Sequence, residues 1–160
     1  MLRLSALRWG LLGSVLLALV SSATATADRV TTSKIPLSAV VTSPCTLDVI
    51  TFTGTAVLTV TETIDPNGSV KPRLDGAVQD PHAVGLLFSY NFKDDLGSAD
   101  LVKVGDLYKA TFTDRLHFIR LGPGGNQQSD DLFITVIVHA TIDSSLVPTV
   151  DRLDYLVDCK

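Results

Sequence analysis

Four polar side chains interrupt the apolar positions of this sequence and are the candidates for ligand contact: Glu62, Tyr90, Asp114 and Arg120. Each lies at an alternate position to its apolar neighbours and so on the same face of its predicted strand. An unpaired charge inside an apolar core is costly. The charged groups therefore pair, reach water or line a polar pocket, where two carboxylates and an arginine would anchor a ligand. The alternative is that Glu62 is solvated at a strand end and that Asp114 marks a β-bulge after which the faces swap.

Two histidines, His117 and His139, are weaker candidates because they fall on the mixed faces of neighbouring strand segments. Pairing of those segments as a hairpin would place both imidazoles on one side. No third group stands at a metal-ligand spacing, and the acidic run at 94–100 lacks the spacing of a calcium loop. A general base would need a partner carboxylate that the sequence does not place. We therefore predict no catalytic residue, no metal and no cofactor.

The two cysteines, Cys45 and Cys159, allow one intramolecular disulfide. An oxidising compartment would favour that bridge, and the alternative is two free or intermolecular thiols. The compartment is indicated by residues 1–27, where Arg3 and Arg8 precede an apolar run at 9–20 and a small-residue end at Ala25-Thr26-Ala27. This order is typical of a cleaved secretory signal peptide, and the run is too short to cross a membrane. We expect a secreted or extracytoplasmic protein with no membrane insertion after cleavage.

Period-two alternation of apolar and polar residues dominates the rest of the chain. The alternating segments are 34–42, 55–64, 70–75, 84–90, 108–118, 132–142 and 153–159, and a β-branched, apolar run occupies 47–53. No helical stripe follows residue 27, so the sequence predicts one all-β domain over 34–160, a lipocalin-like antiparallel barrel of about eight strands, with a β-sandwich as the alternative. Residues 28–33 are expected to form a flexible leader and 93–106 an irregular connection. Pro72 marks its strand as an edge or as locally unpaired.

Composition excludes several classes of protein. Of 160 residues, 46% are hydrophobic and 19% are charged, which is not the composition of a disordered chain. The net charge of −4 and the 6% aromatic content argue against a nucleic-acid partner.

Several short motifs follow one another in a recognisable order: Ser43-Pro44-Cys45, Phe52-Thr53-Gly54, Asp65-Pro66-Asn67-Gly68, Gly122-Pro123-Gly124-Gly125-Asn126 and Asp158-Cys159. This order resembles a group of small exported all-β bacterial proteins of unassigned function. The resemblance implies a bacterial exported domain with a bridge between its terminal regions, and it carries over no catalytic residue. The chain departs from the group after the Asn-Gly turn, where Val70-Lys71-Pro72-Arg73 replaces histidines.

Three functions are consistent with these patterns. The first is the binding of a small, partly apolar molecule without catalysis, the second is an envelope-associated or protein–protein interaction module, and the third is an isomerase or lyase that uses a lumen carboxylate. The sequence favours them in that order.

Overall fold

The computed structural model describes residues 29–65 and 67–159, so the predicted signal peptide lies outside the described residues. Seven strands follow one another: β1 (Arg29–Thr42), β2 (Val49–Ile64), β3 (Val70–Gly85), β4 (Ser89–Val104), β5 (Leu107–Leu121), β6 (Gln127–Ile142) and β7 (Pro148–Cys159). One turn of 3-10 helix, η1 (Pro123–Gly125), lies in the glycine-rich connection between β5 and β6. That connection joins two paired strands.

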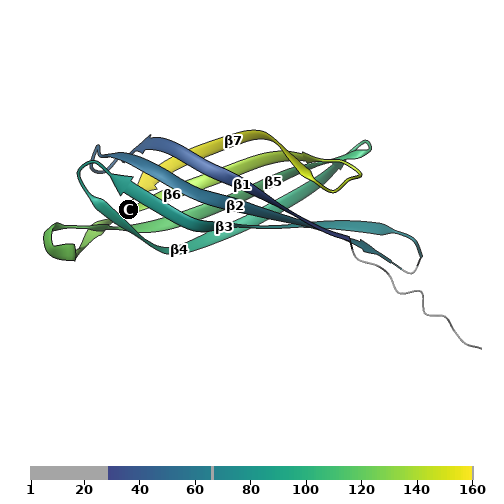
Figure 1. Ribbon diagram of the computed structural model, residues 1–160, viewed down its shortest axis with the longest axis horizontal. Helices are drawn as coiled ribbons and strands as arrows, with labels where there is room; N and C mark the ends of the chain where they lie inside the picture. Colours follow the sequence, from purple (N-terminus) through teal and green to yellow (C-terminus); the bar gives the residue numbers. More distant parts are fainter. Residues whose placement is uncertain (1–28, 66, 160) are drawn as a thin grey trace, which may run out of the picture.

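The strands form one antiparallel sheet in chain order, from β1 to β7. The sheet curls until β1 and β7 lie side by side, giving the elongated, nearly closed barrel of Figure 1. The prediction of a single antiparallel barrel is therefore confirmed. At one end lie the β1–β2, β3–β4 and β5–β6 connections and the C-terminal end of β7, and the remaining hairpins lie at the other end.

Side chains at alternate positions of each strand point into the barrel and fill it. Inward positions of β2, β5 and β6 are almost completely buried, and their aromatic members include Phe52, Phe112 and Phe118. Phe52 and Phe118 make an edge-to-face contact at 6.2 Å between ring centroids. The centre of the barrel is thus packed with apolar side chains. A hydrophobic core therefore lies where the sequence analysis places a ligand lumen.

Three segments differ from the sequence prediction. Residues 29–33 belong to β1 and pair with the end of β2, so they are not a flexible leader. Segments 47–53 and 55–64 belong, from Val49 onward, to one strand, β2, whose register against β3 shifts at Gly54. Residues 93–104 belong to β4, which pairs with β5 along its whole length and turns at Gly105-Asp106. Its residues from Asn91 to Ser98 are all exposed, so no apolar alternation marks them as a strand.

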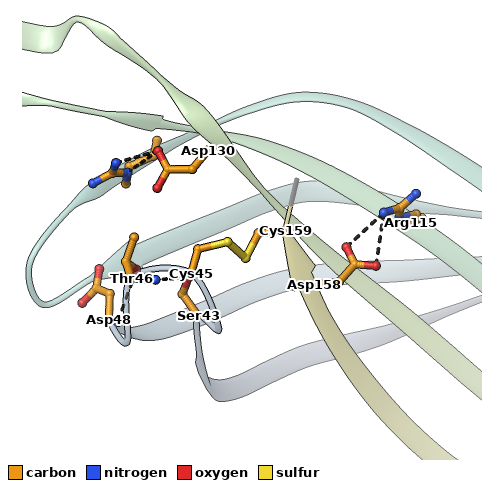
Figure 2. Close-up of a disulfide and its surroundings, with 9 residues drawn as sticks. Ser43, Cys45, Thr46, Asp48, Arg115, Asp130, Asp158 and Cys159 are labelled. Carbon is orange, nitrogen blue, oxygen red and sulfur yellow. Dashed lines mark hydrogen bonds and ion pairs between the residues drawn. A yellow bond between two sulfur atoms is a disulfide. The ribbon is translucent and has the colours of Figure 1, made fainter.

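Side chains rather than a strand ladder hold the seam between β1 and β7. Figure 2 shows the disulfide that joins Cys45, in the β1–β2 connection, to Cys159 at the end of β7, across 114 residues of sequence. The predicted intramolecular bridge is confirmed. Nearer the middle, Tyr155 of β7 packs edge-on against Phe52 of β2 at 5.9 Å. At the other end, Arg29 Nη1 donates to the carbonyl of Ser144 at 3.4 Å.

Candidate ligand-binding groove

The barrel wall is open between β3 and β4. Each strand has 16 residues, yet the two share a single ladder pair, Val84 with Ser89, next to their connecting turn. Figure 1 shows the β2–β3 hairpin diverging from the β4–β5 hairpin toward the end opposite the disulfide. The facing edges of β3 and β4 therefore lack ladder pairing over most of their length, and a groove lies between the two strands.

Local irregularities explain why these two strands do not pair. Asp80 has a left-handed φ of 48° in a bulge of β3, and the register of β4 against β5 shifts at Lys93. Pro72 and Pro81 on β3 have no backbone N–H to give to a neighbouring strand. Pro72, predicted to mark an edge or a locally unpaired strand, pairs with Glu62 of β2 and lies in the part of β3 that has no ladder with β4. His82 lies in β3 beside this bulge.

Asp114, from inside the barrel, accepts a hydrogen bond from a backbone N–H of β3 that has no ladder partner on β4. It is completely buried, and its Oδ2 accepts a hydrogen bond from the backbone N–H of Val78 on β3 at 2.9 Å. Its Oδ1 has no hydrogen-bond partner among the described residues. Burial raises the pKa of Asp114, the hydrogen bond from Val78 opposes this, and the charge of Asp95 adds to the rise. The β5–β6 register shift falls at Arg120, so the alternative that Asp114 marks a bulge is wrong.

We expect an Asp114→Asn variant to be at least as stable as the wild type at neutral pH, because it keeps the acceptor for Val78 without a buried charge. The folded pKa of Asp114 lies above its unfolded value, so its protonation contributes stability below the unfolded pKa. That contribution is lost as pH rises through the folded pKa. The stability of the variant relative to wild type should thus rise with pH, by at most about 1.4 kcal/mol per unit. Urea unfolding at several pH values measures this difference, and a falling difference would contradict it.

The main groove has a volume of about 630 Å³. Its apolar lining comes from both strands and includes Val78, Ala83 and Phe92, while Asp80, His82, Asn91 and Asp95 supply its polar groups. Asp95 pairs with the buried Leu116 and so has inward parity, yet it is exposed because β3 does not cover it. Among the described residues, two carboxylates and no lysine or arginine line the groove, so it offers a partly apolar, negatively charged surface.

A close approach of two glycines limits this groove at one end. A Cβ on Gly97 would lie 3.6 Å from the Gly76 carbonyl oxygen, and a Cβ on Gly76 would lie 2.5 Å from the Phe112 ring. Only glycine at position 76 allows β3 to rest on Phe112 at this point. Beyond it, a second groove of about 450 Å³ contains Arg73 and Asp75, which form an ion pair at 2.8 Å.

A buried aspartate in the β1–β2 connection fixes the other end of the groove. Asp48 accepts hydrogen bonds from the N–H groups of Leu87 and Phe88, at 2.9 and 3.2 Å, and from the hydroxyl of Tyr90 at 3.3 Å. Tyr90 is buried and lines the groove, and desolvation raises the pKa of its hydroxyl, which stays protonated as a donor. A Cβ on Gly85 would lie 1.9 Å from Asp48 Oδ2, so the carboxylate fits only against glycine.

The other candidate residues are distributed differently. Arg120 is the ladder partner of Tyr90, but its guanidinium stacks over Phe88 at 4.4 Å and donates to Asp130 at 3.0 Å. Glu62 lies 3.6 Å from Arg29 at the end of β2. The structure therefore brings Tyr90 and Arg120 together near the groove, places Asp114 beneath it, and leaves Glu62 at another site.

The histidines lie on the outer face of the paired strands β5 and β6. His117 stands between two carboxylates, with Nδ1 at 3.0 Å from Asp94 and Nε2 at 2.9 Å from Asp131, and it stacks on Phe133 at 4.6 Å. From its strand β5, His117 thus contacts a carboxylate of β4 and a carboxylate of β6. His139 lies 3.3 Å from Thr111 and does not join His117. No cluster suited to a metal is found among the described residues.

Sequence reasoning missed Asp48, Asp80 and Asp95, which define the ends and the charge of the groove. A signal for Asp80 is present, because Asp-Pro inside an otherwise alternating segment indicates a break in a strand. Asp48 and Asp95 have no comparable signal, since their positions depend on the relative placement of strands.

Comparison with protein-family models, with curated proteins and with solved structures finds no match to this chain. In the described residues, no helix has the length and hydrophobicity needed to span a membrane.

Proposed function

We propose that this chain is an exported, non-catalytic binding protein whose ligand lies in the groove between β3 and β4. Export is supported by the disulfide between Cys45 and Cys159, a bond typical of oxidising compartments. The observation that carries the binding function is the single ladder pair between two strands of 16 residues each. This opening exposes side chains of inward parity, which in the rest of the barrel form the core.

The lining defines the chemistry of the ligand. Val78, Ala83 and Phe92 give it an apolar contact surface, and the carboxylates of Asp80 and Asp95 attract a positive charge. A partly apolar ligand that carries an ammonium or guanidinium group satisfies both features. Phe92 is 40% exposed, which leaves its ring accessible to such a ligand while its edge rests against Phe118.

The proposal assigns no catalytic role to the two candidate carboxylates, because their contacts keep them out of the groove. Asp114 is buried, with one oxygen committed to Val78, and it stands beneath the groove. Glu62 is paired with Arg29 at a different place in the fold. Neither carboxylate lines the groove, so neither is placed to transfer a proton to a ligand there.

We expect hexylammonium, a small apolar cation, to bind in this groove more tightly than hexanoate, which has the same chain length and the opposite charge. Two-dimensional NMR titration should shift the backbone amides of Val78, Phe92 and Asp95. Replacing Asp95 with Asn should weaken binding by about tenfold, because one charge-assisted contact is lost.

Asp100→Asn is the matched control, since Asp100 is an exposed aspartate of β4 that does not line the groove. It should leave the hexylammonium affinity close to that of the wild type. Equal binding of the cation and the anion, or shifts confined to other strands, would refute the proposed site.

A second function, a protein–protein interaction module, is favoured by an uncharged patch on the outside of β1–β3. Val40, Thr51 and Val84 are ladder neighbours across the three strands, and the Leu86 N–H donates to the Val49 carbonyl at 3.0 Å. Val40, Val84 and Leu86 are 73%, 65% and 81% exposed. Val84 also borders the groove, so the two sites are distinguished on the other strands: a partner at this patch would protect the amides of β2 near Thr51 from exchange and leave those of β4 from Asn91 to Leu96 unchanged.

A further inference from the structure

We propose that the ligand of this groove is an extended polypeptide segment, which adds as a strand along the open edge of β4. This inference rests on the proposed binding function and specifies its ligand class. The partner it requires has apolar side chains at alternate positions and at least one lysine or arginine. The backbone of the groove carries the argument, in addition to the side chains considered above.

The open edge of β4 presents backbone groups in the pattern that a strand recognises. β4 pairs with β5 from Ser89 to Val104, and that ladder uses only one of its two edges. In an antiparallel ladder, successive residues direct their N–H and C=O groups to opposite edges, so about half of these groups face the groove. No ladder pair with β3 covers them between Tyr90 and Val104. An exposed edge of this kind is a template for another strand.

The edge of β3 across the groove is less suited to accept a strand. Its Val78 N–H is already donated to Asp114, and Pro72 and Pro81 have no N–H to donate. The left-handed bulge at Asp80 further interrupts its repeat. An added strand would therefore pair with β4, and the side chains of β3 would serve as the opposite wall.

The groove also limits the length of the segment. It runs from the region of Tyr90 to the point where Gly97 meets Gly76. The six residues from Asn91 to Leu96 span about 20 Å at the rise of a β-strand. A segment of about this length fills the edge, with alternate side chains directed to the apolar floor at Val78 and Phe92.

Charge selects a basic segment over a second copy of this chain. Asp80 and Asp95 stand at the groove, and Asp94 is next to them on β4 with its side chain 62% exposed. A second β4 edge would bring the same carboxylates into opposition, on a chain whose net charge is already −4. Lysine or arginine in the added strand would instead pair with these groups.

The test uses three capped synthetic heptapeptides and isothermal titration calorimetry on the disulfide-bonded protein. The first peptide is Val-Lys-Val-Thr-Val-Lys-Val, the second has the same side chains with N-methyl groups on alternate backbone nitrogens, and the third has Glu in place of Lys. We expect the first peptide to bind. The second should bind at least about tenfold more weakly, because its N–H donors to β4 are lost. The third should also bind at least about tenfold more weakly, because its glutamates are repelled by the carboxylates of the groove. Hydrogen exchange should show protection of β4 amides between Asn91 and Leu96 by the first peptide.

The alternate lysines of the first peptide lie on the face opposite its valines, where Asp94 and Asp100 of β4 also lie. The variants Asp94→Asn and Asp100→Asn therefore distinguish the groove from the rest of β4, and only the first should weaken peptide binding. Equal affinity for the first two peptides would overturn strand addition. So would hexylammonium binding in the groove without binding of the first peptide, and in both cases the proposed binding function would stand. Failure of both hexylammonium and the first peptide to bind would overturn the inference and the proposed function together.

Discussion

A Cys45→Ser, Cys159→Ser double variant is expected to lose about 4–5 kcal/mol of unfolding free energy, because its unfolded chain is no longer constrained by the long loop that the bridge closes. The bridge spans 114 residues and joins the two sides of a seam that has no strand ladder. The loss should lower Tm by more than about 10 °C in a domain of this size. Urea unfolding and calorimetry of the oxidised wild type and the double variant measure both quantities.

Reductant provides the control for this expectation. Reduced wild-type protein should match the double variant, and the variant itself should be insensitive to reductant. A double variant that stays within about 1 kcal/mol of the wild type would mean that Tyr155, Arg29 and their contacts hold the seam without the covalent link.

Truncating Phe112 to alanine should cost about 3–5 kcal/mol, the usual loss for a fully buried phenylalanine. The ring is 0% exposed, and it lies directly under Gly76, where β3 rests on the barrel. The cavity left by the ring would remove this support, so amides of β3 near Gly76 should also exchange faster. Urea unfolding together with hydrogen exchange measures both effects.

Phe92→Ala is the matched comparison, since Phe92 is a half-exposed phenylalanine in edge-to-face contact with Phe118 at 5.7 Å. Its loss should cost only about 1 kcal/mol of stability and should still weaken ligand binding in the groove. Equal destabilisation by the two substitutions would contradict the packing described for Phe112.

The sequence predicts the strands well wherever one face is buried. In β6 the alternation from Leu132 to Ile142 is clear because the inward side chains are buried, and it locates the end of the strand but not its start at Gln127. β4 escapes prediction because its residues from Asn91 to Ser98 are exposed on both faces, and a strand without a buried face has no period-two pattern.

The candidate site is predicted less completely than the fold. The inward parity of Asp114 can be read from its neighbours, but its partner Val78 is 36 residues away on a strand that is not its ladder neighbour. Asp95 depends in the same way on the opening between β3 and β4. The surroundings of Asp114 and Asp95 depend on which strands remain unpaired. The local alternation of apolar and polar residues does not indicate which strands these are.

The order of the sheet has a consequence for how the protein folds. Because every strand pairs with the one that follows it in the chain, the sheet is an up-and-down meander whose ladders are all built from hairpins. Contacts of this kind are separated by short stretches of chain, and they keep the relative contact order low for an all-β protein. Folding can then proceed by successive addition of hairpins, and meeting of the first and last strands is the one step that requires a search over nearly the whole chain.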